Sequence, residues 1–136
     1  MPRAFVDTNI LVYAADKATP ASRKTLVARG LLLQRGLHIS VQVLNEFTVN
    51  ARNPKKLGLR TQEELEWIES WLLYPIHSMT TETFLSARLF HERYQVSHWD
   101  GLILAAAKEA LCEKLYSEDL QNGQIYDGIE VINPFA

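Results

Sequence analysis

The sequence predicts an α/β fold, with one domain built on a parallel sheet of about five short strands flanked by helices. Short apolar segments alternate with helical segments of about 10–15 residues, which is the pattern of strand–helix–strand units. The first segment, Ala4–Val6, is apolar at every position, as expected of a central strand covered on both faces. The length of 136 residues suits one domain, so we expect residues 1–136 to form it.

Five segments are predicted to be strands because each is short, largely apolar and bounded by turn-forming residues. They are residues 4–6, 37–40, 75–77, 114–117 and 129–132. Residues 121–124, Gln-Asn-Gly-Gln, are rich in turn formers and are predicted to be a loop. Asn133-Pro134 ends the last strand.

Helices are predicted after the strands, mainly from their start and stop signals. The predicted helices are residues 8–16, 22–34 and 41–50, one from Thr61, one from Thr80 or Thr81 to Tyr94, and one from Ser97. Thr19 and Pro20 suit the start of the second, and Gly36 its left-handed end. Thr61 opens a capping box with Glu64. The helix from Ser97 is the most apolar and is therefore expected at the centre.

Two tryptophans in the helix from Thr61, Trp67 and Trp71, stand one turn apart. Apolar residues at this spacing form one face of a helix. We interpret the pair as packing, against the core or a partner subunit, rather than as a platform for stacking bases.

The charge balance gives no sign of a polyanion partner. There are 14 Lys and Arg against 16 Asp and Glu, a net charge of −2. Binding to nucleic acid would therefore need a local basic patch or a bound metal. The densest basic patch contains Arg52, Lys55, Lys56 and Arg60. Two interpretations remain open for it, a solvated rim or, beside an acidic site, a contact with phosphates.

The remaining composition argues for a soluble, cytoplasmic protein. Cys112 is the only cysteine, so an intrachain disulfide and a local Cys/His zinc cluster are excluded. It lies in an apolar helical segment, where a buried, inert thiol is expected. Asp7 interrupts the first apolar stretch too early for a signal peptide, and no run of about 18 apolar residues could span a membrane.

Four acidic residues share a position in the predicted fold. Asp7 follows the first strand, Glu46 lies in the helix after the second, Asp100 opens the central helix, and Asp119 follows the fourth strand. Strand ends and the helix starts that follow them meet at one edge of a parallel sheet, where ligands bind. Each also has a structural alternative: Asp7 as an N-cap, Glu46 as a solvated residue, Asp100 in a capping box with Ser97, and Asp119 in a turn.

Four facing carboxylates would repel one another and raise one another's pKa values. A hard divalent cation removes this problem, and Mg²⁺ or Mn²⁺ takes oxygen ligands while keeping several waters. Such a site suits hydrolysis of phosphodiesters, because the metal polarises the phosphoryl oxygen and activates water.

These residues carry a resemblance to a known family. The motifs are Asp7-Thr8-Asn9, residues 40–47 (Ser-Val-Gln-Val-Leu-Asn-Glu-Phe), Trp99-Asp100 and Ser117-Glu118-Asp119. In order and spacing they resemble a PIN-domain ribonuclease, specifically a VapC-type toxin of a toxin–antitoxin pair. The resemblance covers nearly the whole chain.

The resemblance implies a PIN-like fold and a Mg²⁺- or Mn²⁺-dependent endoribonuclease, a hydrolase that cuts RNA phosphodiester bonds. Its metal-binding and catalytic residues would be Asp7, Glu46, Asp100 and Asp119, supported by Thr8, Asn9 and Ser117. The family spacing of two after the serine selects Asp119 rather than Glu118. The resemblance also implies a homodimer and a cognate antitoxin protein that blocks the active site.

Two other functions compete with this one. A metal-dependent phosphotransferase or phosphatase could form an aspartyl phosphate at Asp7, although such enzymes place a second Asp where this chain has Asn9. A non-catalytic module could instead use the acidic rim to hold a basic peptide. A divalent metal should raise the melting temperature of the nuclease and have little effect on a peptide binder.

Overall fold

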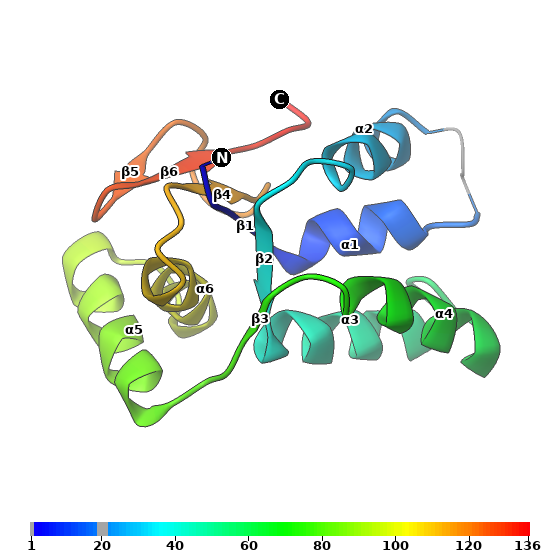
Figure 1. Cartoon of the computed structure of the whole chain (residues 1–136), viewed down its shortest axis with the longest axis horizontal. Coiled ribbons are helices and arrows are strands. Elements are labelled where there is room, and N and C mark those ends of the chain that lie inside the picture. The colour runs from blue at the N-terminus through cyan, green and yellow to red at the C-terminus, as the bar shows by residue number, and fades with distance from the viewer. Residues whose placement is uncertain (1, 19–21) are drawn as a thin grey trace.

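The computed structural model describes residues 2–18 and 22–136 and has the α/β architecture predicted (Figure 1). The strands, in sheet order, are β3 (Ile76–His77), β2 (Leu37–Ser40), β1 (Ala4–Val6), β4 (Lys114–Tyr116), β6 (Ile129–Ile132) and β5 (Ile125–Tyr126). The helices are α1 (Thr8–Ala15), α2 (Arg23–Leu31), α3 (Val41–Arg52), α4 (Thr61–Trp71), α5 (Thr81–Tyr94) and α6 (His98–Glu109). All strand pairs are parallel except β5 with β6.

Helices lie on both sides of the central strands β1 and β2. In Figure 1, α1–α4 lie to the right of these strands, and α5 and α6 pack together to the left. The core between them contains the fully buried side chains of Phe5, Phe47 and Ile103. Every residue of β1 is buried, as the uniformly apolar sequence of this strand predicted.

The pairing of β1 with β4 sets the position of the residues that follow them. Val6 pairs with Tyr116, and the amide of Asp7 donates to the Tyr116 carbonyl at 3.0 Å. The ladder therefore runs one residue beyond the end of β1, and Asp7 lies beside Ser117. Strand β2 ends at Ser40, which is also the N-cap of α3. The carboxyl ends of the three strands thus open toward the same edge.

Strand β5 was not predicted: the predicted loop covers residues 121–124, and residues 125–128 received no assignment. Asp127 and Gly128 form the tight turn between β5 and β6, with φ values of 48° and 86°. An Asp-Gly pair with two positive φ angles is a strong hairpin signal. Since β5 has only two residues, its apolar pattern is too short to identify it.

The second helix is shorter than predicted. Helix α2 ends at Leu31, and Ser22 is its N-cap, with the hydroxyl accepting from the Thr25 amide at 3.2 Å. Gly36 has φ +78° but does not end the helix; its carbonyl accepts from the Ala4 amide at 2.9 Å, so it leads into β2. The predicted start at Thr19 and Pro20 lies outside the described residues.

Helix α4 begins where predicted, but its cap is one residue earlier. Arg60 is the N-cap, and its amide donates to the Glu63 carboxylate at 2.9 Å. Glu64, predicted as the box acid, instead accepts from Arg52 at 2.9 Å. Trp71 is only 2% exposed and stacks on Trp67 with ring centroids 5.2 Å apart, so the packing interpretation is confirmed.

Two further features concern the length of the helices and the single cysteine, whose predicted burial is confirmed. No described helix combines the length and apolar character needed to cross a bilayer. Cys112 is buried, and burial raises the pKa of its thiol to about 11, which keeps it in the unreactive protonated form.

The close approach of α5 and α6 predicts the effect of two glycine substitutions. A Cβ at Gly101 would lie 2.8 Å from the Ala87 carbonyl oxygen, whereas a Cβ at Gly30 would meet nothing within 4 Å. We expect Gly101→Ala to lower the free energy of unfolding by about 1–3 kcal/mol through overpacking. Gly30→Ala, the control, should raise it by up to about 1 kcal/mol through helix propensity. Urea denaturation of both variants measures this, and equal effects would contradict the packing described.

Candidate active site

The four predicted carboxylates come together in one cleft of about 810 Å³. We call this the acidic cleft; its walls include Asp7, Thr8, Asn9, Tyr13, Gln42, Asn45, Glu46, Val49, Asn50, Lys55, Lys56, Trp99, Asp100, Glu118 and Asp119. The acids come from four separate segments: the end of β1, helix α3, the first turn of α6 and the loop after β4. Ser117, the third predicted supporting residue, reaches the site by hydrogen bonding to Asp7.

Asp7 is the most buried of the four, with 4% of its surface exposed. Asp7 is the N-cap of α1, as the structural alternative predicted, and one of its oxygens accepts from the Thr8 amide at 2.7 Å. Its other oxygen accepts from the Ser117 hydroxyl, also at 2.7 Å. Burial raises the pKa of Asp7 to about 7; the two hydrogen bonds oppose this, and repulsion from Asp119 and Glu46 adds to it. Capping therefore accounts for only part of its environment.

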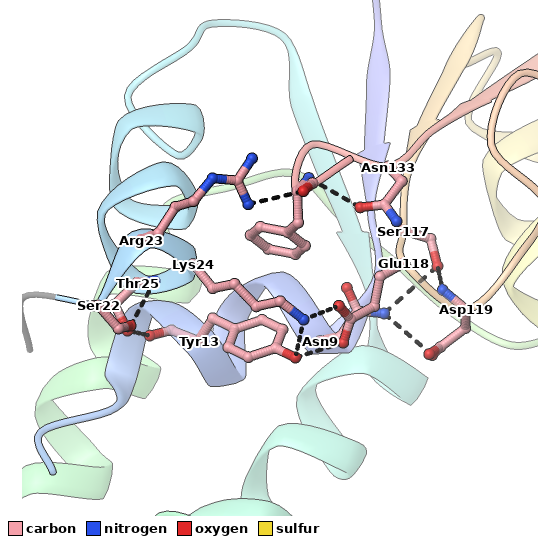
Figure 2. A network of polar contacts seen from close by, with 11 residues as sticks. Asn9, Tyr13, Ser22, Arg23, Lys24, Thr25, Ser117, Glu118, Asp119 and Asn133 are labelled. Atoms are coloured by element: carbon pink, nitrogen blue, oxygen red, sulfur yellow. Dashed lines mark hydrogen bonds and ion pairs between the residues drawn. The ribbon is translucent and has the colours of Figure 1, made fainter. Parts of the chain in front are cut away.

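Ser117 and Asn9 join Asp7 to Asp119. The Ser117 hydroxyl oxygen accepts from the Asp119 amide at 3.1 Å while donating to Asp7. The Asn9 amide group donates to the Asp119 carboxylate at 3.1 Å, as Figure 2 shows. The carbonyl oxygen of Asn9 is buried and has no hydrogen-bond partner in the described structure. Both residues therefore contact the predicted acids directly, Ser117 at Asp7 and at the Asp119 amide, and Asn9 at the Asp119 carboxylate.

Glu118 lies beside Asp119 but differs from it in having a cationic partner. The Lys24 ammonium donates to Glu118 at 3.0 Å and to the Tyr13 hydroxyl at 3.1 Å, and that hydroxyl donates to Glu118 at 2.7 Å (Figure 2). The charge of Glu118 is therefore compensated within the protein. No described residue forms an ion pair with Asp119, which agrees with the choice of Asp119 over Glu118.

Glu46 is held at both of its oxygens. The Thr8 hydroxyl donates to one oxygen at 2.6 Å, and the Gln42 amide group donates to the other at 3.4 Å. Gln42 also donates to the Trp99 carbonyl at 3.2 Å, so it joins α3 to the start of α6. Gln42 was not among the predicted site residues. Its position one helical turn before Glu46 indicates that the two side chains can meet on one face of the helix.

Asp100 is half-buried in the first turn of α6, where its amide donates to the N-cap Ser97 hydroxyl at 3.1 Å. The pKa of Asp100 is raised mainly by burial, is lowered by hydrogen bonding to Ser97, and is raised further by repulsion from Asp119 and Glu46. The acids are thus close enough to destabilise one another's charges.

The donor chemistry of the acidic cleft fits a hard divalent cation. Within the described part of the chain, none of the four acids has an ion pair, and no three His, Cys, Asp or Glu side chains already surround one point as ligands. The acids therefore line a shared space rather than form a closed cage. Such oxygen donors suit an ion that keeps several waters. The unpartnered oxygen of Asn9 adds a neutral acceptor at the same place.

The predicted basic patch divides into two parts. Arg52 pairs with Glu64 at 2.9 Å and Arg60 with Glu63 at 3.2 Å, and neither arginine lines the acidic cleft. Lys55 and Lys56 do line it, are exposed, and have no ion pair among the residues described. Only the two lysines are therefore placed to contact a ligand in the cleft.

Comparison with known proteins identifies the class. A family model for the PIN domain matches residues 4–126, and the chain belongs to this family. PIN-domain nucleases generally use divalent metals. No curated protein matched the sequence.

Several solved structures share the fold. A toxin–antitoxin complex from Klebsiella pneumoniae has a TM-score of 0.70 and 20% identity, covering 96% of this chain and 97% of that one. DNA-bound VapBC from Salmonella typhimurium has a TM-score of 0.68 and 18% identity, covering 96% of this chain and 97% of that one. VapC20 from Mycobacterium tuberculosis is described as a toxin that cleaves the sarcin–ricin loop. It has a TM-score of 0.67 and 15% identity, covering 85% of this chain and 89% of that one.

The raised pKa of Asp7 predicts how the stability of the metal-free protein depends on pH. Between the ordinary pKa of 3.8 and the folded value of about 7, the unfolded carboxyl loses its proton while the folded one keeps it. A rise in pH across this window therefore lowers the free energy of unfolding, and above the window this loss of stability stays constant. In Asp7→Asn, where Asn still caps the helix, this cost is removed.

We expect Asp7→Asn to be more stable than the parent by about 1–3 kcal/mol at pH 8 and to lose this advantage near pH 4. Urea denaturation in EDTA across this range measures the difference. A difference independent of pH would mean that Asp7 is ionised without cost in the folded protein.

Proposed function

We propose that this protein is a VapC-type toxin, an endoribonuclease that hydrolyses RNA phosphodiester bonds with Mg²⁺ or Mn²⁺ and is paired with an antitoxin. The observation that carries the proposal is the meeting of Asp7, Glu46, Asp100 and Asp119 in one cleft with no compensating cation among the described residues. We assign the whole length, residues 1–136, to this nuclease domain.

In this proposal the four carboxylates hold the metal, directly or through water, and Thr8, Asn9 and Ser117 position them. The ion, when bound, polarises the phosphoryl oxygen and activates the attacking water. Hydrogen bonds from Thr8 and Gln42 fix both oxygens of Glu46, which suits this carboxylate to orient that water. Ser117 holds Asp7 and the backbone of Asp119 at one spacing, so the substrate meets a site that is already organised.

The proposed partners are RNA, a cognate antitoxin and a second copy of the chain. Neighbouring folds come from a toxin–antitoxin complex and from VapBC, which supports a protein inhibitor. Leu85 and Leu89 are one turn apart on α5 and 54% and 63% exposed. An apolar pair of this kind on a helix supports a homodimer contact.

The aspartyl-phosphate alternative has no support from the acidic cleft. Where such an enzyme needs a second acid, Asn9 uses its amide group to bind Asp119. The alternative of a peptide-binding module differs from the nuclease in its response to metal and RNA, which the following experiment measures.

We expect Asp7→Asn and Asp100→Asn each to lower RNA cleavage more than about 100-fold while the fold is retained, because each removes a charged metal ligand. The matched control is Glu118→Gln, which alters a carboxylate of the same cleft that Lys24 already neutralises and should keep most of its activity. Cleavage of labelled RNA with and without Mg²⁺ or Mn²⁺, alongside circular dichroism, measures this. Full activity of either Asp variant, or activity in EDTA, would contradict the proposal.

Lys55 and Lys56 predict a change in the salt dependence of RNA binding. Replacing both by alanine should weaken binding and reduce the slope of log K against log salt by about 0.7 for each phosphate that the lysines neutralise. Arg60→Ala is the control, because Arg60 is paired with Glu63 outside the cleft. Filter binding at several salt concentrations gives the slopes; an equal decrease in both variants would mean that the cleft position of the lysines is unimportant.

A further inference from the structure

We infer that Trp99 is a stacking platform for one unpaired base of the RNA, next to the phosphate that is cut. The inference rests on the proposed ribonuclease function and deepens it by naming the residue that positions the nucleotide. It also gives the path of the bound RNA, which runs from Trp99 along α3 toward Lys55 and Lys56.

The exposure of Trp99 is the first observation. Its side chain is 62% exposed, whereas Trp71 is 2% exposed and Trp67 stacks on Trp71. The ring of Trp99 makes a T-shaped contact with His98 at 5.4 Å within the described structure. A single exposed aromatic residue is not unusual on a protein surface, but Trp99 also lines the acidic cleft, where its ring is accessible to a ligand.

The second observation is that the backbone of Trp99 is held in place. The Gln42 amide group donates to the Trp99 carbonyl and to Glu46, and Asp100 follows directly in the same helical turn. The backbone that carries the indole is therefore fixed relative to two of the proposed metal-binding acids, Glu46 and Asp100. A base stacked on the indole would place the adjoining phosphate at a constant position relative to those acids.

The third observation is the direction of the acidic cleft. Its α3 wall is one helical face, formed by Gln42, Asn45, Glu46, Val49 and Asn50. The ends of this face are eight positions apart, a rise of about 12 Å. Trp99 is bonded at the Gln42 end, and Lys55 and Lys56 follow the Asn50 end. The cleft therefore has an aromatic end beside the carboxylates and a cationic end away from them.

This arrangement suits single-stranded RNA because the two ends bind different parts of a nucleotide chain. Aromatic side chains stack on unpaired bases irrespective of sequence, and lysines contact phosphates. Stacking also adds affinity that does not depend on charge, which matters for a chain of net charge −2. A basic peptide would gain nothing from the lysines at the far end.

The test uses wild-type protein with Mn²⁺ and a labelled single-stranded RNA of mixed sequence whose cleaved bond has been mapped. Trp99→Ala should raise KM about 5- to 150-fold with little change in kcat, because stacking acts in the ground state and transition state alike. Trp99→Phe should restore most of the loss. Ile125→Ala is the control, since Ile125 is 61% exposed and lies outside the cleft.

The decisive comparison replaces the base on each side of the cleaved bond by an abasic nucleotide. At one of the two positions the abasic nucleotide should raise the KM of the wild type as much as the Trp99→Ala substitution does. The same abasic RNA should not raise the KM of Trp99→Ala any further. Additive increases in KM from the abasic nucleotide and the substitution, or an unchanged KM in Trp99→Ala, would overturn this inference while leaving the nuclease proposal in place.

Sedimentation of the same variants separates RNA binding from protein contacts. Loss of a dimer in Trp99→Ala, with KM following the monomer fraction, would make Trp99 a subunit contact and would also overturn the inference. Absence of any RNA cleavage by the wild type would overturn the proposed function and the inference with it.

Discussion

The hydrogen bond between Ser117 and Asp7 is the contact on which the acidic cleft depends. It joins the residues that directly follow two neighbouring parallel strands, and it can form because the β1–β4 ladder continues to the amide of Asp7. Ser117 also accepts from the Asp119 amide, so one buried hydroxyl sets the spacing of two acids that are more than a hundred residues apart in the chain. A carboxylate buried to this degree is costly, and short hydrogen bonds offset only part of the cost.

The acids are supported by neutral donors rather than by cations. Ser117 and the Thr8 amide bind Asp7, the Thr8 hydroxyl binds Glu46, and Asn9 binds Asp119. Neutral donors orient a carboxylate without cancelling its charge, whereas an arginine would compete with a metal for it. Glu118 in the same cleft differs, because Lys24 and Tyr13 hold it and the ammonium group compensates its charge within the protein.

The sequence predicted most of the fold because its central elements have unambiguous patterns. The uniformly apolar β1 and the apolar α6 are buried as expected, and Ser97 and Thr80 cap their helices. The failures occur where one or two residues decide the structure. A two-residue strand such as β5 has no periodicity to read, and Gly36 has the same positive φ whether it ends a helix or begins a strand connection.

The meeting of the four acids was predicted from topology, since each lies at a strand end or in the helix that follows. Their hydrogen-bond partners were predicted only where a local motif includes them, as with Thr8, Asn9 and Ser117. Gln42 stands one helical turn before Glu46 in α3, a spacing that the sequence does show, but its contact with the Trp99 carbonyl of α6 has no signal in the local sequence. The division of the basic patch was missed in part for the same reason, because Arg52 pairs with Glu64 of α4, which lies twelve residues further along the chain. Arg60 pairs with Glu63, only three residues away, and this local pairing was not predicted.

The distribution of charge in the cleft explains how a chain of nearly balanced charge can serve a polyanion. Arginines of the patch are neutralised at α4, while the lysines after α3 stay available in the cleft wall. In the proposed nuclease, the four acids at the other end would repel phosphate until a cation is present, so affinity for RNA there would be conditional on the metal. Stacking on the exposed indole next to Asp100 would not be weakened by this repulsion. Attraction at the lysines, stacking at Trp99 and metal-dependent binding at the acids would then act on different parts of one nucleotide chain, and the strand would need the ion in order to occupy the acidic end.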